Sequence, residues 1–131
     1  MTLAVGGENT PRVIHFEIPA TDPDRAVNFY TRVFGWKIDK WNGPQDYWLA
    51  TTGDDKEPGI NGAITPKSEN TPVTTNTIGV PSYEDTVKKI KSAGGKVLTP
   101  KMAVPGIGYM SYCKDTEGNV FGIMQSDPNA K

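Results

Sequence analysis

Apolar residues alternate with polar ones in the run RVIHFEIPA near the amino end. Ile14, Phe16 and Ile18 occupy every second position, which is typical of a half-buried β-strand. The same alternation places His15 and Glu17 on the other face of that strand. The pattern predicts one apolar face and one face that carries an imidazole and a carboxylate.

A helix is predicted directly after this strand. The run Thr21-Asp22-Pro23-Asp24 supplies a capping side chain, a proline for the first turn and acidic groups near the positive end of the helix. Apolar residues then follow at helical spacing up to a glycine that ends the helix: Ala26, Phe29, Tyr30, Val33 and Gly35. Extended runs follow at 36–40, 47–52 and 60–64.

The same order of elements recurs from Thr74 onward. We expect a strand over 75–80, a helix that starts with a capping box at Ser82, and extended runs at 96–99, 108–114 and 120–125. A gapless shift of 60 positions matches Ile18 with Ile78, Val27 with Val87, Gly35 with Gly95, Asp55 with Asp115, Glu57 with Glu117, and Gly62 with Gly122. The sequence therefore predicts two related βαβββ modules.

These modules predict an α+β fold. We expect a flexible tail over residues 1–11 and one domain over 12–126, made of modules 12–66 and 73–126. Each helix must cover an apolar sheet face, so each small sheet keeps its second face free. Two free faces side by side would form a cup-shaped mixed sheet.

Composition narrows the classes of partner. The 131 residues include 14 Lys plus Arg and 15 Asp plus Glu, so a formal net charge of -1 favours neither nucleic acid nor an anionic membrane. No signal peptide and no run of 18 apolar residues is found, and we expect a cytoplasmic protein. The single cysteine, Cys113, lies in the apolar run YMSYC, which predicts a buried and inert thiol.

Five short motifs follow one another along the chain. They are His15-Phe-Glu-Ile-Pro, Asp22-Pro-Asp-Arg-Ala, Phe29-Tyr30, Val33-Phe34-Gly35-Trp36 and Asp115-Thr-Glu-Gly-Asn119. Over about residues 12–126 the chain resembles the vicinal oxygen chelate superfamily of glyoxalase I, bleomycin-resistance proteins and extradiol dioxygenases. The resemblance implies the cup-shaped fold and, as is common in that superfamily, a homodimer. Because this scaffold hosts many chemistries, it does not by itself assign one.

The resemblance also implies where a metal would be held. Members that use a metal bind it with one side chain from the first and one from the last strand of each module. Those positions align with His15, Gly62, Thr75 and Gly122, of which His15 alone carries a good ligand atom. We therefore expect neither a metal nor another cofactor, with His15 as the one retained ligand position.

His15 and Glu17 are the candidates for chemistry. The imidazole is either a hydrogen-bonded histidine of the cup, a direct participant in ligand binding or proton transfer, or a metal ligand together with Glu17, water and substrate. Glu17 either contacts His15 or ligand, or reaches solvent at the rim of the cup. If the protein is an enzyme, these two residues are the expected catalytic pair.

The remaining expected lining of the cup is aromatic or small, which suits a flat or largely apolar ligand. With His15 and Glu17, the expected ligand-binding residues are Tyr47, Trp48, Gly62, Thr75, Thr77, Tyr109, Tyr112, Gly122 and Met124. The favoured function is metal-free binding of a small organic molecule, as in the bleomycin-resistance branch. The alternative is a glyoxalase-like lyase or isomerase that uses His15 and Glu17, or a metal-dependent dioxygenase.

Overall fold

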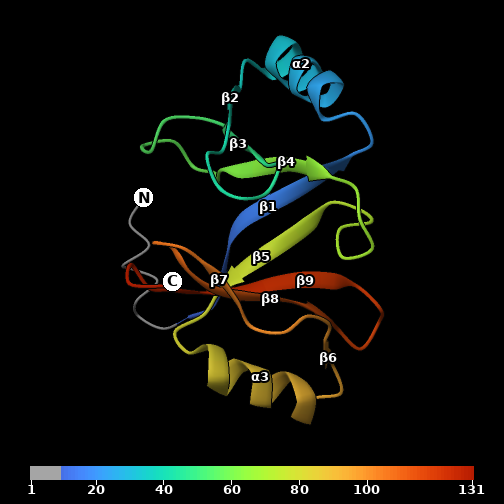
Figure 1. Ribbon diagram of the computed structural model, residues 1–131, viewed down its shortest axis with the longest axis vertical. Coiled ribbons are helices and arrows are strands. Elements are labelled where there is room, and N and C mark those ends of the chain that lie inside the picture. The colour runs from blue at the N-terminus through green and yellow to red at the C-terminus, as the bar shows by residue number, and fades with distance from the viewer. Residues whose placement is uncertain (1–9) are drawn as a thin grey trace. The chain divides into compact units, whose positions relative to one another are not determined.

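The computed structural model describes residues 10–131, which divide into two compact units. One unit is Ile14–Thr75, and the other comprises residues 10–13 with Asn76–Lys131. Each unit contains one helix beside a sheet of mixed strand direction (Figure 1). The α+β class and the predicted order of strand, helix and strands are confirmed in both. The expected tail over 1–11 lies largely outside the described residues, and the boundaries of the single domain and its modules stay predictions.

The first unit is built on four strands. They are β1 (Arg12–Ala20), β2 (Lys37–Lys40), β3 (Trp48–Thr51) and β4 (Gly62–Pro66), in the spatial order β2-β3-β4-β1, although the first two residues of β1 fall in the second unit. β1 runs parallel to β4, with Phe16 opposite Gly62 and Ile18 opposite Ile64, whereas β2, β3 and β4 pair antiparallel. Residues directly opposite in a ladder share a face, so this register determines which side chains lie together.

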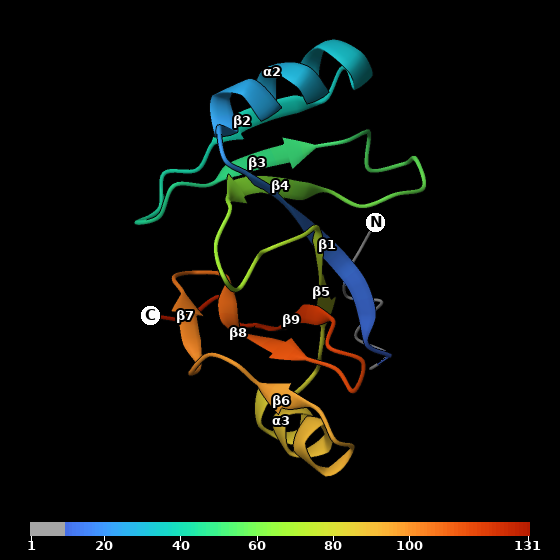
Figure 2. The same cartoon turned by 90° about the vertical axis from the view of Figure 1, so that its right-hand side faces the viewer.

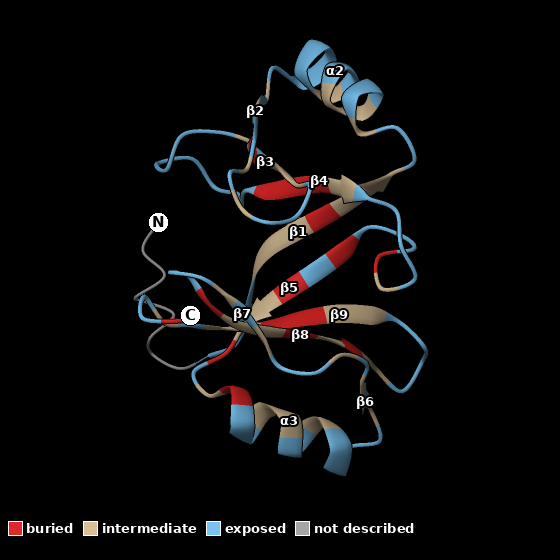
Figure 3. Cartoon of the chain, viewed as in Figure 1, coloured by how far each residue is buried: buried red, intermediate tan, exposed pale blue. Residues whose placement is uncertain are grey.

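Helix α2 (Pro23–Phe34) connects β1 to β2 with the predicted caps. The Asp22 carboxylate accepts a hydrogen bond from the Arg25 backbone N–H at 3.2 Å, and Gly35 ends the helix at φ +73°. Figure 2 shows the helix running beside β2. No residue of α2 is buried, and its ribbon is coloured exposed or intermediate throughout (Figure 3). Phe29 and Val33 of the predicted apolar stripe are 53% and 56% exposed.

The second unit repeats this plan with more strands. It comprises β5 (Thr75–Gly79), α3 (Tyr83–Ser92), β6 (Lys96–Val97), β7 (Met102–Val104), β8 (Gly108–Lys114) and β9 (Val120–Ser126), although Thr75 itself falls in the first unit. The order of its sheet is β5-β9-β8-β6, and β7 also pairs with β8. Cys113 and Ile123 form its core with half-buried Val87 and Ile90 of α3, so the predicted burial of the cysteine is confirmed.

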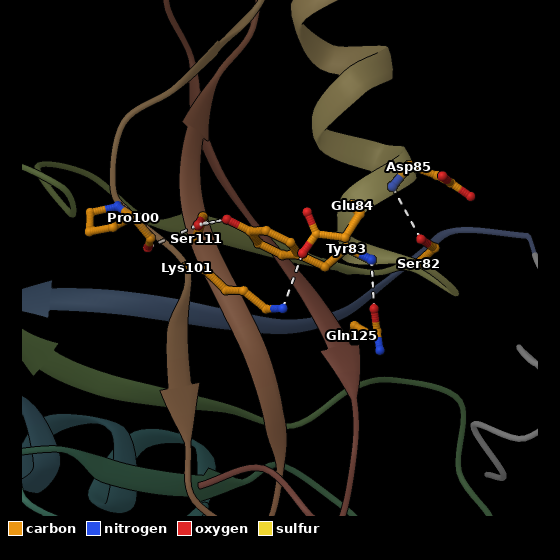
Figure 4. A network of polar contacts seen from close by, with 8 residues as sticks. All are labelled: Ser82, Tyr83, Glu84, Asp85, Pro100, Lys101, Ser111 and Gln125. Carbon is orange, nitrogen blue, oxygen red and sulfur yellow. Dashed lines mark hydrogen bonds and ion pairs between the residues drawn. The ribbon is translucent and has the colours of Figure 1, made fainter.

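Polar contacts fix the start of α3 on this sheet (Figure 4). Gln125 accepts a hydrogen bond from the Tyr83 backbone N–H at 2.7 Å, and the Tyr83 hydroxyl lies 2.6 Å from Ser111 Oγ. Lys101 Nζ lies 3.1 Å from a Glu84 carboxylate oxygen. These contacts tie the start of α3 to β8, β9 and the segment before β7, so the network stabilises the position of the helix on its sheet.

The predicted gapless repeat is wrong in the last strand of each module. Ile18 and Ile78 stand 60 positions apart, and each lies opposite a buried isoleucine. Those partners are Ile64 and Ile123, which stand 59 positions apart and are 0% and 1% exposed. The equivalence of the two modules therefore slips by one residue between their first and last strands.

The turns before these last strands explain the slip. Asp54 accepts the Lys56 backbone N–H at 3.1 Å, and Asp115 accepts the Glu117 backbone N–H at 2.8 Å, so both aspartates begin the same kind of turn. The sequence match had paired Asp55 with Asp115. From these equivalent aspartates the first module reaches its buried isoleucine two residues later than the second, but it reaches its aspartate one residue sooner after the first strand. The net shift of one residue changes which residues of the last strand face each side of the sheet.

Candidate functional site

Three polar side chains form a hydrogen-bonded chain on one face of the first unit. His15 and Glu17 project from the face of β1 opposite to Phe16, and Tyr47 lies directly before β3. The Tyr47 hydroxyl lies 2.6 Å from His15 Nε2 and donates to Glu17 Oε2, also at 2.6 Å. Glu17 is 5% exposed, and the other two residues are half-buried. The predicted pair of imidazole and carboxylate is thus joined by a phenol.

The proton positions in this chain follow from the chemistry of a phenol. Tyr47 has one proton, which it donates to Glu17, so its oxygen accepts from His15 Nε2–H. Burial lowers the pKa of His15 from its ordinary value of 6.5, and the negative charge of Glu17 opposes that shift in part. The imidazole is therefore neutral at pH 7, and its Nδ1 carries a lone pair that can accept a proton or a hydrogen bond.

Tyr47 is held in place by a tryptophan. The Trp41 ring packs edge-on against the Tyr47 ring at 5.9 Å, and the Trp41 backbone N–H donates to Tyr47 O at 2.8 Å. A side chain at Gly43 would lie 2.1 Å from the Trp41 ring, so the turn between β2 and β3 requires glycine there. This turn fixes the hydroxyl that links His15 to Glu17.

Two predicted lining residues of the first unit lie on the other face of the sheet. Gly62 is opposite Phe16, and a Cβ at Gly62 would lie 2.5 Å from the Phe16 ring. Trp48 is opposite Ile64 on that same face. The prediction that both face the side of His15 is wrong. Ala63, which is fully buried opposite Glu17, occupies the position that Gly62 was expected to hold.

The predicted residues of the second unit also divide between two faces. Gly122 lies opposite both Thr77 and Tyr112, so these three share a face with Met124, which is two residues further along β9. Tyr109 lies on the other side, where Lys101 Nζ is 4.6 Å from its ring centroid. The ligand-binding role of Gly122, Thr77, Tyr112 and Met124 stays a prediction. Tyr109 does not share their face.

The donor atoms do not fit the metal site that the resemblance implies. In the first module the two expected corners are His15 and, after the register correction, Ala63, which has no donor atom. In the second module Gly122 has none, and the hydroxyl of buried Thr75 already donates to Val73 O at 2.8 Å. Across residues 10–131 no three His, Cys, Asp or Glu side chains gather where they could hold a metal ion. A single imidazole at these four positions provides too few ligand atoms to hold a transition metal.

Sequence reasoning missed the link between the two polar residues it selected. Tyr47 was expected as aromatic lining, and Trp41 was not among the expected site residues. Tyr47 and Trp48 are neighbours in the extended run predicted at 47–52, so alternation places them on opposite faces, and this signal is in the sequence. The choice of face, however, depends on the pairing of β3 with β4, which places Trp48 opposite Ile64.

Comparisons with known proteins agree with the fold. A family model described as the Glyoxalase/Bleomycin resistance protein/Dioxygenase superfamily matches residues 12–123. The chain is 29% identical over 124 residues to a Mycobacterium tuberculosis protein called "Putative glyoxylase CFP32", covering 92% of this chain and 47% of that protein. It thus spans about half the length of these mycobacterial relatives.

Two further matches cover most of both chains. A "Glyoxylase-like domain-containing protein" of Didymella fabae is 32% identical over 113 residues, which cover 82% of this chain and 88% of that protein. The crystal structure of methylmalonyl-CoA epimerase from Mycobacterium tuberculosis aligns with a TM-score of 0.67 at 12% identity, over 88% of each chain. Within residues 10–131, no helix has the length and apolar character needed to cross a membrane.

Proposed function

Because the chain belongs to the glyoxalase, bleomycin-resistance protein and dioxygenase superfamily, we propose that it binds a small organic molecule without a metal, through the face that carries His15. The ligand is flat and largely apolar and carries one hydrogen-bond donor, such as a phenolic hydroxyl. Its donor meets His15 Nδ1. The protein acts in the cytoplasm as a homodimer.

The observation that supports this proposal is the hydrogen-bonded chain from His15 to Glu17. Tyr47 accepts from Nε2 and thereby leaves Nδ1 as an acceptor, for which residues 10–131 provide no hydrogen-bond partner. Burial keeps the imidazole neutral, so it recognises a donor and not an anion. The half-buried ring of Tyr47, which stacks on the imidazole with ring centroids 6.2 Å apart, supplies apolar surface beside it.

Titration with 4-nitrophenol tests this binding in a buffer that contains a metal chelator. This probe is flat, has one hydroxyl, and its phenol and phenolate forms absorb at different wavelengths. The parent protein should bind it at one saturable site. His15→Ala should weaken binding about two- to tenfold, the equivalent of one lost hydrogen bond.

Trp48→Phe is the matched control, because Trp48 lies on the other face of the same sheet. It should bind 4-nitrophenol as the parent does. Binding of equal strength in the parent and in His15→Ala would refute the proposed site, and loss of binding on removal of metal would refute the metal-free mode.

A second candidate, proton transfer by a lyase or isomerase, is favoured by the same chain of contacts. When Nδ1 takes a proton from a substrate, the positive charge that forms on His15 is stabilised by Glu17 across the Tyr47 hydroxyl. The probe distinguishes the two functions when bound and free probe are compared at one pH, since full proton transfer raises the phenolate share of the bound probe above that of the free probe. Chelator-resistant turnover of the hemithioacetal of methylglyoxal and glutathione, abolished in His15→Ala, would establish the enzyme.

A further inference from the structure

A groove of about 650 Å³ lies on the first unit and is lined by neither His15, Glu17 nor Tyr47. Its lining comes from the carboxyl end of β1, from the first two turns of α2 and the residues before it, and from the connection between β4 and β5. This volume falls in the range of small-molecule sites in proteins. The groove is therefore a place on this unit, apart from the face of His15, where a ligand has room.

Backbone contacts hold the walls of the groove. The Lys67 backbone N–H donates to Ala20 O at 3.0 Å, which fixes the connection to the end of β1. Further along the connection, the hydroxyls of Ser68 and Thr71 lie 2.9 Å apart, and Thr71 is 3% exposed. Because the connection is bonded to the end of β1, and α2 follows β1 after two residues, both walls of the groove are anchored to the end of that strand.

Two cations line this groove, Arg25 from α2 and Lys67 from the connection. Across residues 10–131 neither side chain has an ion-pair partner within 4.0 Å. One acidic residue, Asp22, also lines the groove, but its carboxylate caps α2 by accepting the Arg25 backbone N–H. The charge at the groove is therefore positive on balance.

Apolar side chains lie beside these charges. Phe29 is 53% exposed and Val73 is 63% exposed, and both line the groove with the half-buried ring of Tyr30. A flat ring that covers them would remove apolar surface from water, which is favourable in proportion to the area covered. An unpaired cation beside an exposed aromatic ring is a combination that suits a ligand with an apolar body and an anionic group.

We propose that this groove binds a small organic anion with a flat apolar body. The anionic group interacts with Arg25 and Lys67, and the body covers Phe29 and Val73. This site differs in chemistry from the one at His15, where a neutral imidazole accepts a hydrogen bond from an uncharged donor. The two sites are separate, and each can fail its test without the other.

Binding of 1-naphthoate, with 1-naphthamide as its uncharged counterpart, tests this groove by isothermal titration at low ionic strength. The parent should bind the carboxylate, and the amide should bind several-fold more weakly. Arg25→Gln and Lys67→Gln should each weaken naphthoate binding about two- to fivefold, which is the range for exposed charge pairs. Added salt should weaken naphthoate binding as well.

Exposed cations that do not line the groove provide matched controls. Arg32→Gln changes the same helix, and Lys37→Gln changes β2, so both alter net charge equally without touching the groove. They should bind 1-naphthoate within about 1.5-fold of the parent, as distant exposed charges are largely screened. Circular dichroism of every variant verifies that the fold is kept.

Amide chemical shifts locate the bound anion. Addition of 1-naphthoate should shift the amide resonances of Ala26, Phe29 and Val73, and His15→Ala should leave this response unchanged. Three results would each overturn the proposal: no binding by the parent, equal binding of the carboxylate and the amide, or equal weakening in the groove variants and their controls. Shifts confined to the face of His15 would overturn it too, while leaving the function proposed for that face intact.

Discussion

Replacing Tyr47 with phenylalanine removes one hydroxyl and keeps the ring against Trp41. That hydroxyl makes two hydrogen bonds of 2.6 Å, one to the buried Glu17 carboxylate and one to neutral His15. A hydrogen bond to a charged group contributes about 1.5–3 kcal/mol to stability, and one between neutral groups about 0.5–1.5 kcal/mol. Since Tyr47 is half-buried and water can replace part of this contribution, we expect Tyr47→Phe to lower the free energy of unfolding by about 2–3 kcal/mol.

Urea unfolding at pH 7, followed by far-ultraviolet circular dichroism, measures this loss without relying on the tryptophan beside the altered ring. Tyr109→Phe is the control, because its hydroxyl has no hydrogen-bond partner among residues 10–131 and its ring contact with Lys101 is kept. The control should change stability by less than about 0.5 kcal/mol. If Tyr47→Phe were as stable as the parent, the hydrogen-bonded chain would not be a formed feature of the folded protein.

Three more outcomes follow from the structure. In thermal unfolding, Gly62→Ala should lower the free energy of unfolding by about 1–3 kcal/mol, because its Cβ would lie 2.5 Å from the Phe16 ring. Gly122→Ala should lower it by less, because the nearest contact of its Cβ is 3.1 Å away. The reverse order of the two losses would contradict the register. Burial raises the pKa of Cys113 to about 11, so a thiol reagent at pH 8 should modify it only on unfolding. The pKa of His15 in the folded protein lies below 6.5, so as the pH is lowered His15 takes up its proton at a higher pH in the unfolded chain than in the folded one. The free energy of unfolding should therefore fall as the pH drops through 6.5 toward the folded pKa. His15→Ala should flatten this slope in urea titrations at several pH values, and an unchanged slope would exclude His15 as its source.

The order of elements could be predicted from sequence because each signal was local. The Asp22 cap, the Gly35 end of α2 and the capping residue Ser82 all function as expected. The alternation in β1 correctly separated His15 and Glu17 from Phe16. These features depend on neighbours within a few residues, which a single sequence contains.

The pairing of strands depends on residues far apart in the sequence, and the predicted register of the last strand in each module was wrong. Matching Gly62 with Gly122 assumed a gapless repeat, but the turn that begins at Asp54 delays β4, so Ala63 takes the position expected for Gly62. A slip of one residue in a strand exchanges its two faces. The metal argument survives this correction because alanine, like glycine, offers no ligand atom.

The prediction that the apolar stripe of α2 covers the sheet was correct only in part. Its spacing predicted that Phe29 and Val33 cover the sheet, yet both are more than half exposed. Tyr30 instead stacks on Trp36, with ring centroids 5.1 Å apart. Periodicity identifies the apolar face of a helix, but which part of that face is covered depends on how the helix lies on its sheet.

Nitrogen-15 NMR of the imidazole tests the central claim most directly, and the chain has a single histidine, so its signals need no further assignment. At pH 7 the structure predicts a protonated Nε2 and an unprotonated Nδ1 in a neutral ring, and 4-nitrophenol should shift the Nδ1 resonance more than that of Nε2. A ring protonated at Nδ1 in place of Nε2, or an imidazolium at pH 7, would contradict the hydrogen-bonded chain from His15 through Tyr47 to Glu17 and the binding mode that depends on it.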